Sequence, residues 1–126
     1  MADLTVHVDD LIFGADWVSE NAAMRAAVAD ALPFEGDAAR WGEELYASVD
    51  VSATPETTRT EVAPGAIAYW PAGPAVCLFW GPTPASAGDE PRAASPVGVV
   101  AQVRDAGALG EIPPGGARLG LDATED

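Results

Sequence analysis

Two arginine-containing segments are the first candidates for recognition chemistry in this sequence. Arg40 precedes Trp41 and two glutamates, and Arg92 follows Pro91 in a polar stretch. A guanidinium group beside an aromatic ring can hold a peptide carbonyl or a carboxylate ligand. The simpler interpretation is that each arginine pairs with a nearby acid while Trp41 fills one end of the fold. We treat Arg40, Trp41 and Arg92 as candidate ligand-binding residues.

An aromatic segment is the second candidate. Residues 65–84 read GAIAYWPAGPAVCLFWGPTP, which predicts strands at 66–70 and 75–80 joined by a Pro/Gly turn. Adjacent residues of a strand point to opposite faces, so Tyr69 and Trp70 cannot share one core, nor can Phe79 and Trp80. One aromatic of each pair therefore lines an apolar groove suited to a proline ring, or is covered by the helix or a loop.

The other reactive groups predict no metal site and no cofactor. The chain has one histidine, His7, and one cysteine, Cys77, which are too few nitrogen and sulfur ligands for zinc. Because Cys77 lies in an apolar strand with no histidine nearby, we expect it to be a small buried hydrophobe. The Gly-rich residues 110–116 lack the Lys-Ser/Thr ending of a phosphate-binding loop.

The elements that position these residues are mostly short strands. Besides the aromatic hairpin, alternation of apolar residues predicts strands at 4–8, 11–18, 43–51, 60–62, 97–103 and 117–121. One amphipathic helix is predicted over about residues 20–32, with Ser19 as its N-cap and Pro33 ending it. Loops or Gly/Pro-rich connections are predicted at 34–42, 85–95 and 105–116, and a loose tail at 122–126.

This pattern predicts a mainly β fold in one domain, residues 1–126. Seven or eight short strands with one helix do not alternate as a parallel α/β sheet requires. A small closed antiparallel barrel, with the helix plugging or covering one end, fits the pattern best.

The composition restricts the partners and the compartment. Twenty acidic residues oppose six arginines, with no lysine, for a formal net charge of −14. Such a surface disfavours nucleic acid, and either adaptation to a salt-accumulating halophilic cell or a basic partner would explain it. The sequence has no apolar run of membrane-spanning length and no signal peptide, so we expect a cytoplasmic protein.

Three further patterns carry a family resemblance. They are LPF at 32–34 followed by RWGEELY at 40–46; PG at 64–65 with AYWP at 68–71, leading into CLFWGPTP at 77–84; and DEPR at 89–92 with SPV at 95–97. Together they resemble the small cyclophilin-like barrel family of bacteria and archaea. The resemblance implies a compact cyclophilin-type barrel with a single main helix.

The resemblance also frames two hypotheses about function. True cyclophilins are peptidyl-prolyl isomerases that use an arginine beside an apolar proline pocket, but their Phe-x-x-x-x-His-Arg motif is absent here. We therefore expect a module that binds a peptide or small ligand in an aromatic groove. The alternative is a weak prolyl isomerase in which Arg40 or Arg92 replaces the usual arginine. An exposed Trp70 or Trp80 would favour a homodimer.

The charge leads to a first prediction. Raising KCl from about 0.1 M to about 1 M shortens the screening length from ~10 Å to ~3 Å and should reduce carboxylate repulsion in the folded protein. We expect the melting temperature, followed by circular dichroism, to rise over this range. A melting temperature that stays constant or falls would contradict adaptation to salt.

Overall fold

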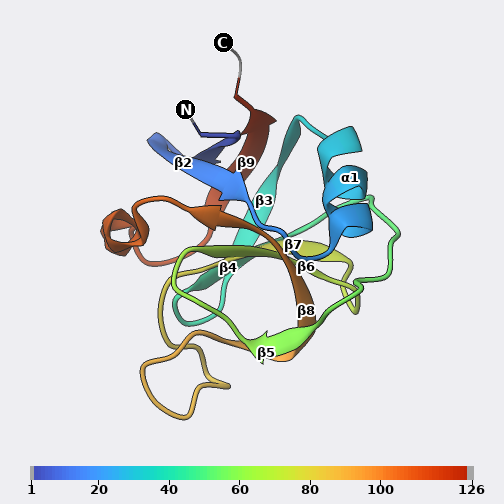
Figure 1. Ribbon diagram of the computed structural model, residues 1–126. Helices are drawn as coiled ribbons and strands as arrows, with labels where there is room; N and C mark the ends of the chain where they lie inside the picture. Colours follow the sequence, from blue (N-terminus) through green and yellow to red (C-terminus); the bar gives the residue numbers. More distant parts are fainter. Residues whose placement is uncertain (1, 125–126) are drawn as a thin grey trace.

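The strands of this protein close into an antiparallel barrel. The computed structural model describes residues 2–124, and Figure 1 shows their arrangement. The strands are β1 (Leu4–Val8), β2 (Leu11–Trp17), β3 (Phe34–Arg40), β4 (Glu44–Ser48), β5 (Arg59–Glu61), β6 (Ala66–Trp70), β7 (Ala75–Phe79), β8 (Arg92–Val103) and β9 (Ala117–Ala123). Their order in the sheet is β2-β1-β9-β3-β4-β7-β6-β8-β5, and an additional pairing of β2 with β8 closes the ring. The predicted mainly β, closed barrel with one main helix is confirmed.

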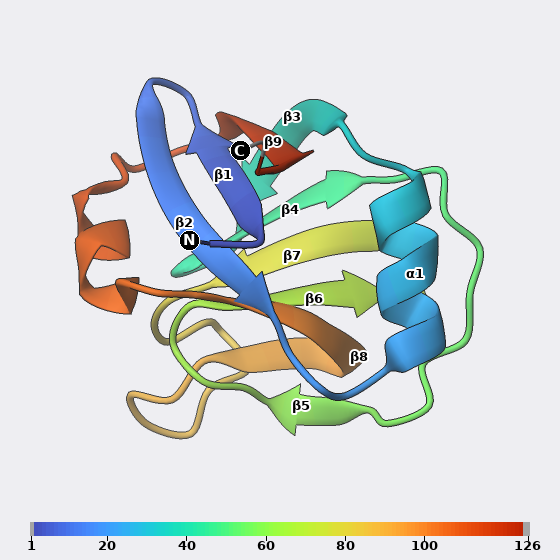
Figure 2. The same cartoon turned by 45° about the horizontal axis from the view of Figure 1, so that its top comes forward.

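Strand β8 belongs to two sheets along its length. Its second half pairs with β6, from Tyr69 opposite Gly98 to Ala66 opposite Gln102, and with the end of β2. Its first half pairs instead with the three residues of β5, which lie outside the ring. In Figure 2 the long curved β8 passes from the barrel to the edge where β5 lies.

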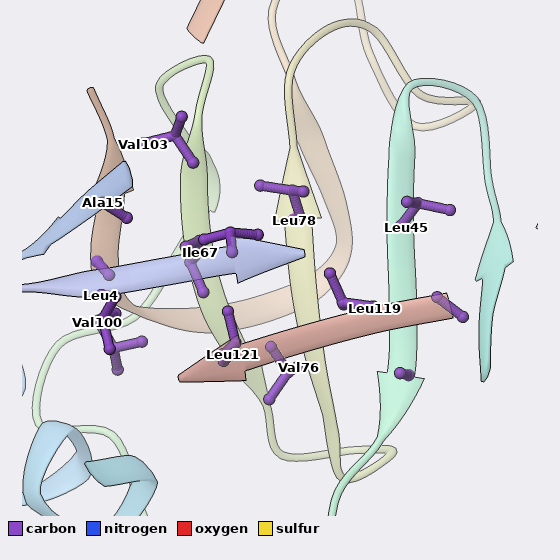
Figure 3. Packing of buried hydrophobic residues seen from close by; sticks show 14 of the residues in the cluster. Leu4, Ala15, Leu45, Ile67, Val76, Leu78, Val100, Val103, Leu119 and Leu121 are labelled. Atoms are coloured by element: carbon purple, nitrogen blue, oxygen red, sulfur yellow. The ribbon is translucent and has the colours of Figure 1, made fainter. Parts of the chain in front are cut away.

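The larger hydrophobic core fills the inside of the barrel. Alternate residues of each strand point inward, as the side-chain period of two requires. Figure 3 shows that the inward residues come from many strands and converge. Those labelled there are Leu4, Ala15, Leu45, Ile67, Val76, Leu78, Val100, Val103, Leu119 and Leu121, all buried.

A second, smaller core lies on the opposite face of β6 and β7. It contains Val62, Ala66, Ala68, Cys77, Phe79, Ala93, Val97 and Val99. Several of these residues alternate with members of the larger core along the same strand, for example Cys77 between Val76 and Leu78. Strands β6 and β7 are therefore apolar on both faces, which explains their almost continuous burial.

The main helix, α1 (Ala22–Asp30), covers one end of the barrel, as Figure 2 shows. Met24 and Val28 point into the larger core. The helix lies within the predicted range of 20–32, but Ser19 is not its cap. The N-cap position is Asn21, and the Glu56 side chain accepts a hydrogen bond from the Ala23 N–H at 3.0 Å.

Three predicted connections are partly wrong. Residues 34–40 form β3, although Gly36 and Asp37 indicated a loop, because pairing with β9 gives them ladder hydrogen bonds. Strand β8 begins at Arg92, inside the loop predicted at 85–95, and residues 106–111 form a 3₁₀ helix, η1 (Ala106–Glu111). Strand β9 continues through Asp122 and Ala123, so these two residues are not a loose tail, and 125–126 lie outside the described residues.

None of the helices found within residues 2–124 combines the length and apolar character needed to span a membrane.

Asn21 connects α1 to the second half of β8 and generates a stability prediction. It is buried and adopts a left-handed backbone with φ of 57°. Its side chain donates to the Val99 carbonyl at 3.1 Å and accepts from the Thr57 N–H at 2.8 Å. Asn21→Ala strains the backbone and leaves both groups unpaired, which should cost on the order of 2–4 kcal/mol in urea unfolding.

Asn21→Gly is the matched variant, because it removes the same two hydrogen bonds without straining the left-handed backbone. We expect Asn21→Gly to lose less stability than Asn21→Ala. Equal stability of Asn21→Ala and the unchanged protein would contradict this role for Asn21.

Candidate ligand-binding pocket

A pocket of about 230 Å³ lies on the outer face of the barrel. The main sheet forms one side, through β4, β6 and β7, and the first half of β8 covers it from the other side. Its walls are Trp41, Glu44, Tyr46, Trp70, Cys77, Ala93, Ala94 and Val97. The volume is below the range of about 300–1,000 Å³ typical of pockets for drug-sized ligands, so this one suits a small group.

Strand alternation puts the two β4 residues of the pocket on one face. Leu45 points into the barrel, so its neighbours Glu44 and Tyr46 point outward. In the register of β4 and β7, Tyr46 pairs with Cys77. The sheet therefore places a carboxyl group, a phenol ring and a thiol side by side.

Aromatic rings make up much of the pocket wall. The Tyr46 and Trp70 rings meet edge to face, with centroids 6.3 Å apart and planes at 74°. The Trp70 indole N–H donates to the Ser95 hydroxyl at 2.6 Å. Because Ser95 lies on the first half of β8, this bond ties the covering strand to the barrel.

The turn between β3 and β4 positions Trp41. Gly42 has φ of 64°, and a Cβ there would lie 2.7 Å from the Thr83 Cα, so the turn requires glycine. The Glu43 N–H donates to the Pro82 carbonyl, and the Trp41 N–H donates to the Glu44 carbonyl, both at 2.9 Å. Residues 81–84 thus act as a support for this turn as well as ending the strand before them.

Glu44 is the polar group of the pocket, and its carboxyl is only slightly exposed, at 5% for the residue. Burial raises its pKa to about 7, while a hydrogen bond from the Cys77 thiol acts in the opposite direction. Burial, and then the Glu44 carboxylate, also raise the pKa of Cys77 well above its usual range. Burial therefore favours the neutral thiol, and the expectation of a small buried cysteine is confirmed.

The two candidate arginines do not line the pocket. The Arg40 guanidinium lies 4.8 Å from the centroid of the Trp80 ring and donates to the carbonyls of Gly42 and Pro113. Arg92 forms ion pairs with Glu90 at 3.0 Å and Glu61 at 3.2 Å.

Glu90, the ion-pair partner of Arg92, is fixed by further hydrogen bonds. Its carboxylate accepts the N–H groups of Ala87 and Gly88, each at 2.7 Å. These backbone bonds, with the Arg92 guanidinium, lower the pKa of Glu90 to about 2. Arg92 therefore organises its own loop.

The four hairpin aromatics separate as alternation predicts. Tyr69 points into the barrel, where its hydroxyl donates to the Val51 carbonyl at 2.6 Å, and Trp70 lines the pocket. Phe79 is fully buried in the smaller core, and Trp80 is buried against the larger one. Of the seven predicted site residues, only Trp41 and Trp70 meet at the pocket. Trp80 is buried and Trp70 is partly exposed, so of the two rings whose exposure would favour a homodimer only Trp70 reaches the surface.

Sequence reasoning did not select Glu44, Tyr46 or the alanines of β8. Alternation in the predicted strand at 43–51 already placed Glu44 and Tyr46 on the face opposite Leu45. Nothing local, however, indicates that β8 covers this face, because β8 lies about fifty residues further along the chain.

Comparison with known proteins gives the family. The model of the family described as cyclophilin-like matches residues 3–112. The chain belongs to the cyclophilin-like family. It is also similar to the solution structure of the hypothetical protein AF2241 from Archaeoglobus fulgidus, with 31% sequence identity and a TM-score of 0.75. The match covers 96% of this chain and 93% of AF2241. No curated protein matches the chain significantly.

The buried Glu44 carboxyl makes stability depend on pH. Because its folded pKa of about 7 exceeds the ordinary value of 4.5, the folded state keeps a proton that the unfolded chain releases between these pH values. The contribution of Glu44 to folding stability is therefore highest below pH 4.5, and it is lost as the pH rises through 7. The cost above pH 7 is roughly 3 kcal/mol.

Glu44→Gln should remove this dependence. We expect urea unfolding at pH 5 and pH 8 to differ less in Glu44→Gln than in the unchanged protein, with the variant the more stable at pH 8. Glu43→Gln, at the half-buried neighbouring position outside the pocket, is the control. Identical pH profiles for Glu44→Gln and the unchanged protein would refute a buried, proton-retaining carboxyl.

Proposed function

We propose that this cyclophilin-like protein is a binding module and that its ligand, a small molecule or the side chain of a peptide, enters the pocket above Glu44. The observation that supports this most strongly is the composition of the pocket wall. Three aromatic side chains surround a small apolar space that contains one buried carboxyl group. Apolar walls with a few placed polar groups are typical of sites for small ligands.

The alternative, a weak prolyl isomerase, needs a guanidinium group beside an apolar pocket. Arg40 is engaged by Trp80 and two carbonyls, and Arg92 by two glutamates, so neither arginine faces the pocket. The geometry therefore favours binding without turnover. The similarity to AF2241 supports the fold, and because AF2241 is described as a hypothetical protein, it suggests no activity for this chain.

Ala94 provides the test, because it lines the pocket yet is exposed and belongs to neither core, so a larger side chain there should reduce the space for a ligand while the fold is kept. The unchanged protein is titrated with small neutral fragments and Xaa-Pro peptides in molar KCl, and amide and indole signals are followed by NMR. We expect shifts at Trp41 and Trp70, and at least about tenfold weaker binding by Ala94→Phe, which corresponds to a loss of ~1.4 kcal/mol or more in binding free energy.

Ala26→Phe, on the exposed face of α1, is the matched control and should bind as the unchanged protein does. If Ala94→Phe binds the ligand as tightly as the unchanged protein does, the ligand must bind outside this pocket. If no probe shifts any signal of the folded protein, the proposal fails. Exchange between cis and trans peptide signals, recorded in the same spectra, tests the isomerase alternative directly.

A further inference from the structure

We propose that the pocket selects a compact organic cation, an alkylated ammonium group, with the Glu44 carboxylate as its counter-ion. This inference rests on the proposed function and names the chemical class of its ligand. It is carried by three observations: a carboxyl group without a basic partner, the aromatic wall around it, and the charge of the whole chain.

The Glu44 carboxyl is buried without a cation beside it. Within residues 2–124, no ion pair involves Glu44, and the group that acts on its carboxyl is the neutral Cys77 thiol. A buried carboxylate is costly unless a positive group lies next to it. A neutral ligand would leave that cost in place, whereas a cation in the pocket would remove it.

The aromatic walls suit an alkylated cation. The side chains of Trp41, Tyr46 and Trp70 all line a space of about 230 Å³, and the rings of Tyr46 and Trp70 are close to perpendicular. Aromatic faces attract a cation within about 6 Å through their quadrupole, and cages of such rings recognise quaternary ammonium groups. Alkyl groups on the nitrogen would also bury apolar surface against Ala93 and Val97.

An inorganic metal ion fits this pocket less well. A hard cation needs several oxygen ligands, and no group of three or more metal-binding side chains is present in the described part of the chain. A single carboxylate among apolar walls is better suited to a cation whose charge is surrounded by alkyl groups.

The electrostatic field of the protein also favours a cationic ligand. The formal net charge is −14, and a strongly negative protein concentrates cations near its surface. The nearest positive group on the covering strand, Arg92, is directed to Glu61 and Glu90 and does not line the pocket.

Binding of a cation should depend on pH through Glu44. The other ionisable groups in the pocket are the Cys77 thiol on β7 and the Tyr46 phenol on β4, while β6 and β8 contribute only Trp70, alanines and a valine. Affinity should therefore increase as pH rises from 6 to 8, because the carboxyl loses its proton over this range.

The test compares choline with 3,3-dimethylbutan-1-ol, which has the same shape but carbon in place of the charged nitrogen. Both are titrated into the full chain at pH 6 and pH 8, with NMR shifts of the tryptophan indole signals as the measurement. We expect choline to bind at least about tenfold more tightly than the alcohol at pH 8 and to lose most of this advantage at pH 6. Glu44→Gln should remove most of the advantage at pH 8 together with its dependence on pH, and Glu43→Gln should keep both.

The outcomes separate this inference from the proposed function. If the alcohol binds as tightly as choline, the pocket is a binding site but the cation inference is overturned. If neither compound binds while neutral fragments do, the cation inference is again overturned and the proposed function stands. If nothing binds, both fail. Should Glu44→Gln not fold, the comparison of choline with the alcohol at two pH values decides the question without a variant.

Discussion

The structure depends on one constraint, the closure of the barrel through the second half of β8. Hydrogen bonds from this half to β6 on one side and β2 on the other complete the ring. Only half of a twelve-residue strand is needed for this, so the first half continues beyond the barrel. It pairs with β5 and lies over the outer face of the sheet. Barrel closure and the covering of the outer face are thus performed by one continuous strand.

This covering strand gives the sheet a second buried face. In a simple barrel the outward residues of β4, β6 and β7 would meet water and would be polar. Here Ala68, Cys77 and Phe79 pack with Ala93 and Val97, and the pocket is a gap beside this apolar layer. The Trp70–Ser95 hydrogen bond links the two layers beside that gap. The pocket is therefore a consequence of the way the second layer ends.

Glu44 is where stability and the proposed recognition conflict. A carboxyl at the floor of an apolar pocket opposes folding whenever it is charged, and an apolar residue would pack there without that penalty. A buried carboxyl among aromatic side chains is the type of local cost that folded proteins carry at functional sites, which is consistent with the proposed binding role. The two candidate arginines show the opposite behaviour, since each stabilises a turn or loop: Arg40 donates to the Gly42 carbonyl, and Arg92 pairs with Glu90.

The sequence by itself determined the class of the fold and much of its order. Alternating apolar residues and turn residues are local signals, and they placed the hairpin of β6 and β7, the strand β1 and the helix α1. Local signals failed for β3, where Gly36 and Asp37 form a strand only because β9 supplies partners. Of the site, alternation required Tyr69 and Trp70 to face opposite sides of the sheet, and the structure shows that Trp70 is the one at the pocket. Only the tertiary structure decided that Glu44, Tyr46 and Cys77 share a covered pocket, because that depends on strand register and on a distant segment folding over them.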